Sequence, residues 1–80
     1  MKCKVVGYKP VKYTSKKTGK LVSGNEVYVL VDTPPESVVG GLVSIQWISS
    51  NVGYVPELND HINILFNEYR SVEAVITVVE

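Results

Sequence analysis

The sequence predicts an all-β protein with five short strands. Its valine, isoleucine and tyrosine residues occur in short runs that glycine, proline, asparagine and serine interrupt, and several of these runs alternate apolar with polar residues. This pattern is typical of strands joined by turns, and no segment shows the spacing of an amphipathic helix. A chain of 80 residues is long enough for one domain, which we place at 1–80.

The first two strands are expected to form a long hairpin. The first strand covers Lys2–Tyr8 and resumes at Val11–Thr14, because Gly7 and Pro10 interrupt it and proline cannot donate to a β-ladder. The segment SKKTGK is the expected turn, in which the glycine supplies a positive φ. The second strand is expected over Leu21–Asp32, where VYVLV has the composition of a strand buried on both faces.

Three further strands are expected at Leu42–Ser49, His61–Asn67 and Val72–Val79. Two prolines and two glycines mark Thr33–Gly41 as a loop, and Pro56 in the connector 50–60 is suited to open one helical turn. Five strands with a single long connector favour a small closed barrel, because closure removes sheet edges. We expect a five-stranded OB-like closed barrel with a protruding basic β-hairpin, and an SH3-like barrel is the competing interpretation.

The charge is distributed unevenly although the net charge is zero. Residues 1–20 contain seven lysines and no acidic residue, a net charge of +7, whereas residues 21–80 contain one arginine and eight acidic residues, a net charge of −7. The local field depends on this arrangement and not on the sum, so the basic segment indicates an anionic partner. The alternative is that solvated lysines protect an edge strand from aggregation.

Basic and aromatic residues interleave in the predicted hairpin. Ammonium groups neutralise phosphates and tyrosine rings stack on unpaired bases, so this mixture favours a single strand of nucleic acid. The candidate binding residues from this pattern are Lys9, Lys12, Tyr13, Lys16, Lys17, Lys20 and Tyr54, with Tyr13 and Tyr54 preferred for stacking and Tyr8 next. Tyr28 is expected either in the core or on the barrel face beside the hairpin. Trp47 shares a face with Val43 and Ile45, which favours a place in the core over a binding role.

Nothing in the sequence indicates catalysis, and no cofactor or metal is expected. No catalytic or ligand motif surrounds the single histidine, His61. The single cysteine, Cys3, excludes a disulfide framework and a cysteine-based zinc site, and it is expected to be buried on a strand. The N-terminal segment lacks the apolar stretch of a signal peptide, and no apolar run is long enough to cross a bilayer. We therefore expect a soluble, cytoplasmic protein with no membrane partner.

Two segments carry a resemblance to a known family. KKTGKLVSGNEVYV and HINILFNEYRSVEAV resemble small single-stranded DNA-binding, helix-destabilising proteins of the filamentous-phage type and their relatives in phages and integrative elements. The resemblance implies an OB-fold barrel that dimerises and coats single strands without strong sequence preference, as in DNA replication. The hairpin residues it implies as DNA contacts are Lys12, Tyr13, Lys16, Lys17, Lys20 and Tyr28. Arg70 occupies the last turn, where such proteins commonly have glycine, and its charge adds it to the candidate set.

The sequence therefore predicts a single-stranded DNA-binding protein that acts as a homodimer. Two other functions remain open on the same small barrel. One is a protein-interaction adaptor, which would use the acidic remainder of the chain as its contact surface. The other is an RNA-binding module, since the sequence does not separate DNA from RNA.

Overall fold

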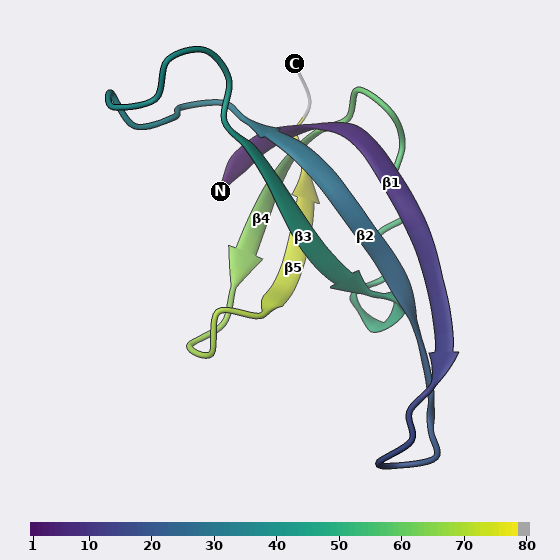
Figure 1. Ribbon diagram of the computed structural model, residues 1–80. Helices are drawn as coiled ribbons and strands as arrows, with labels where there is room; N and C mark the ends of the chain where they lie inside the picture. The colour runs from purple at the N-terminus through teal and green to yellow at the C-terminus, as the bar shows by residue number, and fades with distance from the viewer. Residues whose placement is uncertain (79–80) are drawn as a thin grey trace.

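The computed structural model describes residues 1–78, which form a five-stranded antiparallel sheet (Figure 1). The strands are β1 (Lys2–Thr14), β2 (Leu21–Val31), β3 (Val43–Ser49), β4 (His61–Phe66) and β5 (Val72–Thr77), and a single turn of 3-10 helix, η1 (Ser50–Val52), follows β3. The order in the sheet is β3-β2-β1-β4-β5. The predicted all-β class and its five strands are confirmed, while the predicted strand end at Val79 lies outside the described residues.

The sheet is not closed. β3 and β5 are its two end strands, and over residues 1–78 no ladder of backbone hydrogen bonds joins them, so the predicted closed barrel is not observed. β4 and β5 lie behind β1–β3 in Figure 1, because the sheet curves over on itself. This curvature brings β3 and β5 into contact and encloses an interior between the two halves of the sheet.

The core lies in this interior and is small. Seven side chains from β1 to β4 are almost completely buried: Cys3, Val5, Val27, Val29, Ile48, Ile62 and Ile64. Full burial of a valine or isoleucine side chain stabilises the fold by roughly 1.5–3 kcal/mol, because apolar surface is removed from water. Cys3 is buried as expected. Burial raises the pKa of its thiol, and the negative charge of Asp32 raises it further.

β1 is continuous and longer than expected. The predicted break between Tyr8 and Val11 is absent, and at Gly7 a register shift between Val5 and Gly7 accommodates one extra residue as a β-bulge. The end of the connector 50–60 is hydrogen-bonded to this bulge. The Val5 amide donates to the Asp60 carbonyl at 2.8 Å, and the Asn59 amide donates to the Val5 carbonyl at 2.8 Å. Pro10 is tolerated because β4 pairs only with the start of β1, which leaves the rest with one neighbouring strand.

The helical turn expected at Pro56 is found instead at Ser50–Val52. The Ser49 hydroxyl accepts a hydrogen bond from the Asn51 amide at 3.3 Å, and Gly53 ends the turn at a φ of 80°. A short polar residue before the turn and a glycine after it are the usual helix-end signals. Pro56 is buried. No helix in the described part of the chain has the length and apolar character needed to cross a membrane.

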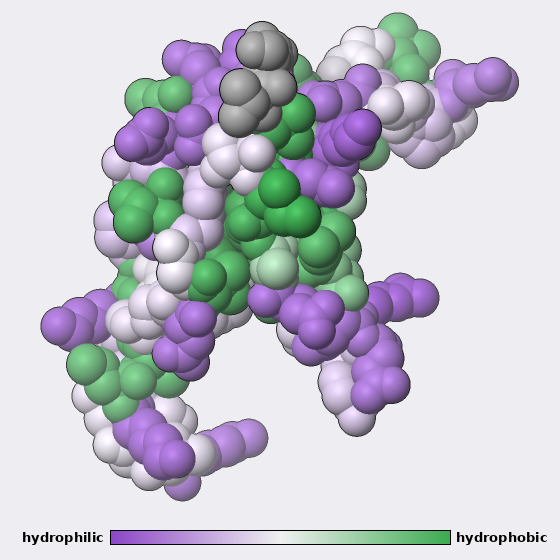
Figure 2. Space-filling view, turned by 180° about the vertical axis from the view of Figure 1, so that it is seen from behind, coloured by the Kyte–Doolittle hydropathy of each residue, from purple (hydrophilic) through white to green (hydrophobic). Residues whose placement is uncertain are grey.

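Some apolar side chains lie outside the core on β4 and β5. Leu65 pairs with Ala74 and Asn63 pairs with Ile76, so these four residues share the face turned away from the interior. Leu65 and Ile76 are exposed, as is Val78 just after β5. Figure 2 shows apolar side chains gathered over this side of the molecule.

Candidate nucleic-acid interface

β1 and β2 continue past the other strands as a two-stranded arm, which we define as residues 11–24 (Figure 1). At its end Thr14 pairs with Leu21, the Ser15 amide donates to the Lys20 carbonyl at 2.8 Å, and the Gly19 amide donates to the Ser15 carbonyl at 2.8 Å. Gly19 has a φ of 68°, a conformation that glycine adopts without steric cost. The predicted turn in SKKTGK is confirmed.

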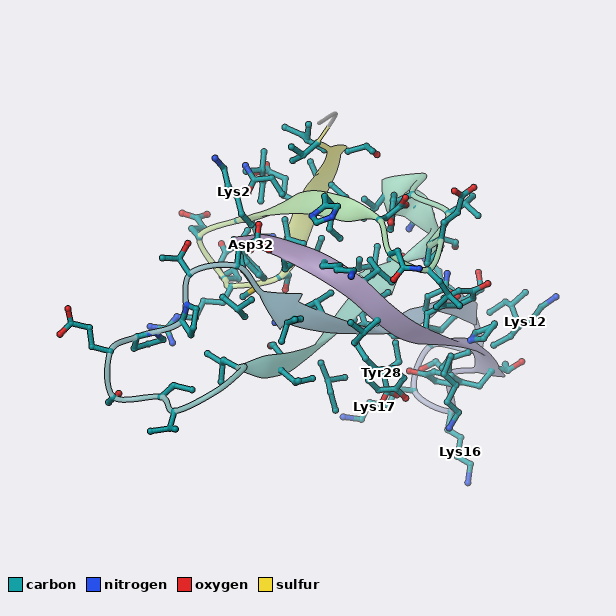
Figure 3. The ribbon with its side chains drawn as sticks, turned by 90° about the horizontal axis from the view of Figure 1, so that it is seen from above. Lys2, Lys12, Lys16, Lys17, Tyr28 and Asp32 are labelled. Carbon is teal, nitrogen blue, oxygen red and sulfur yellow. The ribbon has the colours of Figure 1, made fainter. Side chains whose placement is uncertain are left out.

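The lysines of the turn are exposed at the tip of the arm. Lys16, Lys17 and Lys20 surround the turn, and the exposed Lys12 lies a few residues before it. In Figure 3, Lys12 and Lys16 lie on the opposite side of the molecule from Lys2 and Asp32. The arm therefore concentrates positive charge away from the acidic residues of the β2–β3 loop.

The strand register divides the predicted residues between the two faces of the β1–β3 sheet. Residues directly opposite one another in an antiparallel pair share a face. Tyr8 pairs with the core residue Val27, so Tyr8 lies on the core side. The face turned away from the core, here called the outer face, carries Lys9, Val11, Tyr13, Val22, Glu26, Tyr28, Leu30, Val43, Ile45 and Trp47. Lys9, Tyr13 and Tyr28 thus share the outer face, whereas Lys12 lies on the side of Tyr8.

β3 is inverted relative to the expected pattern. Val43, Ile45 and Trp47 share a face as the sequence predicts, but this is the outer face, and their side chains are 58, 60 and 41 % exposed. The core side of the strand carries Ser44 and Gln46, whose side chains bond to each other at 2.8 Å. The expected place of Trp47 in the core is therefore wrong. An exposed row of large apolar side chains of this kind marks an interaction surface.

Two aromatic rings lie against glycines on the outer face. A Cβ atom on Gly24 would lie 2.9 Å from two atoms of the Trp47 indole ring, and a Cβ on Gly7 would lie 3.3 Å from the Tyr28 ring. Glycine inside a strand signals a close approach of this kind. Tyr28 and Trp47 are diagonal neighbours on β2 and β3, roughly 7–8 Å apart. The absence of a side chain on each glycine therefore lets a ring settle on the backbone.

Glu26 lies between these rings on the same face. It pairs with Lys9 on one side and with Trp47 on the other, and the Tyr28 hydroxyl donates to its Oε1 at 3.3 Å. Loss of hydration, together with the negative charge of Glu26, raises the pKa of Tyr28. The phenol therefore remains a protonated donor at neutral pH.

Tyr54 is placed apart from the other candidate residues. Its ring packs against the core cluster, and its hydroxyl donates to Asp60 Oδ2 at 2.7 Å. Burial, followed by this hydrogen bond, raises the pKa of Tyr54 well above the usual range. The ring attaches the connector to the core and lies outside the interface.

Arg70 lies across a cleft from β3. The cleft has a volume of about 420 Å³ and occupies the space where the two ends of the sheet fail to join. Its lining comes from the end of β3 and from the β4–β5 turn: Gln46, Trp47, Ser49, Arg70, Ser71 and Val72. Arg70 is thereby positioned beside one of the exposed rings. The sequence interpretation missed Trp47 as a site residue, although Gly24 within a strand was a signal for it.

Over residues 1–78 no group of three or more histidine, cysteine or acidic side chains is placed to hold a metal ion. The chain matches no protein-family model, no curated protein and no solved structure. The interpretation of the site therefore depends on the residues described above.

Proposed function

We propose that this protein binds and coats single-stranded DNA with little sequence preference. The observation that carries the proposal is the outer face, where β3 exposes Trp47 and other apolar side chains next to Tyr28 and a lysine-rich arm. Unpaired bases present flat apolar surfaces attached to a chain of phosphates. Exposed rings beside cations are complementary to this chemistry.

The sheet order supports an OB-like arrangement with an open seam. In the OB-fold, a partly open five-stranded barrel, the face of the second and third strands and the loops after the first and fourth strands bind oligonucleotides. Here those elements are the outer face of β2 and β3, the tip of the arm, and the turn 67–71. Both loops carry cations, Lys16, Lys17 and Lys20 in one and Arg70 in the other.

The charges on the outer face suggest how a bound DNA strand would lie. Glu26 repels phosphates from the middle of the outer face, while Lys9 and the lysines of the arm attract them. The sugar–phosphate chain would therefore follow β1 and the arm, and the bases would turn toward Tyr28 and Trp47. Stacking contributes roughly 1–3 kcal/mol per base and does not depend on base identity, which accounts for weak sequence preference.

Homodimerisation is part of the proposal. It follows from the family resemblance, and the exposed apolar residues Leu65, Ile76 and Val78 supply a surface for it on the far side from the outer face (Figure 2). A dimer through β4 and β5 would leave the arm of each subunit open to DNA. Sedimentation equilibrium should then give twice the monomer mass without DNA, and a monomer at all concentrations would contradict this part of the proposal.

A protein-interaction adaptor is the second candidate function. Val43 and Ile45 are aliphatic and offer no aromatic stacking, and Val39, at 99 % exposure in the β2–β3 loop, contacts nothing that would bury it. These residues fit a protein partner as well as a nucleic acid. Retention of a protein from nuclease-treated lysate, without any oligonucleotide affinity, would favour this function.

The proposed function is tested by fluorescence anisotropy of a labelled dT oligonucleotide over a range of salt concentrations. If Lys9, Lys12, Lys16, Lys17 and Lys20 each neutralise one phosphate, the slope of log K against log salt should be about −3.5. Binding that is absent or indifferent to salt would contradict the proposal. Competition with a U oligonucleotide of the same length separates DNA binding from the RNA alternative, because only RNA offers the 2′-hydroxyl.

A further inference from the structure

The cleft between β3 and the β4–β5 turn combines groups that suit a single nucleotide. Of its six lining residues only Arg70 is charged, and Trp47 supplies a flat aromatic ring. Gln46, Ser49 and Ser71 add an amide and two hydroxyls. A volume of about 420 Å³ is in the range of small-molecule sites, which are typically 300–1,000 Å³.

The backbone of Arg70 indicates that its side chain is needed there. Arg70 has a φ of 63°, in the left-handed region that glycine adopts freely and that other residues adopt at a steric cost. A glycine would form this turn more easily. Backbone strain at an exposed, charged residue on the rim of a cleft is a reason to look for a function of the side chain.

The turn around Arg70 is firmly built. The Arg70 amide donates to the Asn67 carbonyl at 3.0 Å, and the Asn67 amide donates to the Ser71 carbonyl at 2.9 Å. The Asn67 side-chain oxygen accepts from the amides of Tyr69 and Ser71 at 2.9 and 3.1 Å. These four hydrogen bonds hold the backbone in its strained conformation. They therefore set the position and direction of the Cα–Cβ bond of Arg70.

The opposite wall of the cleft is also held in place. The Trp47 ring rests against Gly24, so it cannot sink further toward the sheet, and it stays 41 % exposed. Glu68 and Glu73 are near Arg70 in the sequence, but neither lines the cleft. An arginine and an exposed indole thus line one small space, and among its lining residues in the described part of the chain they are the only charged residue and the only aromatic one.

We propose that this cleft binds one unpaired nucleotide, with its phosphate on Arg70 and its base stacked on Trp47. The guanidinium can bind a phosphate through two parallel hydrogen bonds, which a lysine cannot do. This inference rests on the proposed function and extends it: the DNA strand would be held at two places, by the arm and by the cleft on the β3 side of the base of the arm. The open seam of the sheet would then be a binding feature.

The test uses the fact that Trp47 is the only tryptophan in the chain. Its fluorescence reports on the cleft, while anisotropy of a labelled dT oligonucleotide reports on binding anywhere. We expect the oligonucleotide to quench Trp47 in parallel with the anisotropy change. Thymidine monophosphate should also quench it at high concentration, and thymidine should do so less well because it lacks the phosphate.

Arg70→Gly is the decisive variant, since it removes the cation and suits the backbone. We expect about tenfold weaker oligonucleotide binding, the size of one charge-assisted hydrogen-bonded contact, and a much smaller quench by thymidine monophosphate. Arg70→Lys keeps the charge, so its oligonucleotide affinity should lie between that of the parent protein and that of Arg70→Gly. Lys2→Ala, which removes one positive charge at the far end of β1, should leave the affinity within about twofold at physiological salt, where charges more than about 8 Å away are screened.

The outcomes separate the two proposals. Oligonucleotide binding with unchanged Trp47 fluorescence, or with full affinity in the Arg70→Gly variant, would overturn the cleft inference and leave the proposed function standing. If neither signal changes at low salt, both proposals fail. Circular dichroism and a thermal melt confirm that each variant is folded, and Arg70→Gly is expected to melt no lower than the parent protein.

Discussion

The indole ring of Trp47 lies against the backbone of Gly24. A Cβ on Gly24 would come within 2.9 Å of two ring atoms and within 2.6 Å of the Ile48 carbonyl oxygen. An exposed aromatic side chain usually has several rotamers in solution, whereas this one rests on a flat floor provided by the neighbouring strand. The ring is therefore held in one place, which would lower the entropic cost of the stacking proposed for it.

Gly24→Ala should move this ring and destabilise the sheet. The added methyl group meets a backbone carbonyl that cannot yield easily, so we expect a loss of about 1–3 kcal/mol in the free energy of unfolding, measured by urea denaturation. Gly41→Ala is the matched control, because a Cβ there would meet only the end of the flexible Leu30 side chain. Equal effects at both positions would show that the close contacts at Gly24 have no special importance.

Replacing Lys16, Lys17 and Lys20 together by alanine should weaken DNA binding without unfolding the protein. All three are exposed on the turn of the arm, away from the core. The loss of three phosphate contacts should reduce the slope of log K against log salt by about 2. Salt titrations of the parent and the variant check this value, and an unchanged slope would place the phosphates elsewhere.

Tyr13→Ala and Tyr8→Ala should differ although both rings are exposed on β1. Tyr13 lies on the outer face. If its ring stacks on a base, Tyr13→Ala should weaken binding of a dT oligonucleotide by roughly 1–3 kcal/mol. Tyr8 lies on the core side, so Tyr8→Ala should weaken this binding less. Anisotropy titrations of the two variants provide the comparison, and a larger loss for Tyr8 would mean that DNA follows the opposite face of the arm.

Arg70→Gly should stabilise the fold even as it weakens binding. Relief of the left-handed strain is offset in part by the greater freedom of glycine in the unfolded chain, so we expect a gain of about 0.5–1 kcal/mol in the free energy of unfolding. Asn59→Gly is the control, since asparagine tolerates its φ of 70° better. A loss of stability in Arg70→Gly would mean that the arginine side chain supports the turn.

Alkaline pH should destabilise the protein partly through Tyr54. Burial and the bond to Asp60 raise its pKa in the folded state above the ordinary value of 10, so the unfolded chain ionises first as the pH rises. The contribution of Tyr54 is complete below pH 10 and declines above it. Thermal melts between pH 8 and pH 11 should show this decline, and Tyr54→Phe should reduce it while lowering stability by about 1 kcal/mol at pH 7.

The strands were predictable because their signal is local. Alternation of apolar and polar residues and the turn residues between them locate five strands close to their observed bounds. The same alternation shows that Val43, Ile45 and Trp47 share a face, but it does not show which face meets the core. That choice is made by the register with β2, where Val27 pairs with Gln46, and a shift of one residue would reverse it.

The candidate site was predictable in its cations and not in its rings. The lysines are exposed because the sequence around them contains a hairpin turn, which is a local property. The roles of Trp47 and Tyr54 depend on distant partners, Gly24 for the first and the core cluster for the second. The open seam depends on whether two end strands meet, and a strand pattern alone does not specify this.

The arm has few interactions with the rest of the molecule. A two-stranded hairpin is only marginally stable by itself, so its outer amides should exchange with solvent far faster than those of Cys3 and Val5 at the other end of the same strand. Substitutions there change no core packing and cost little global stability. The proposed affinity for DNA can therefore be changed by substitutions in the arm while the rest of the fold stays intact.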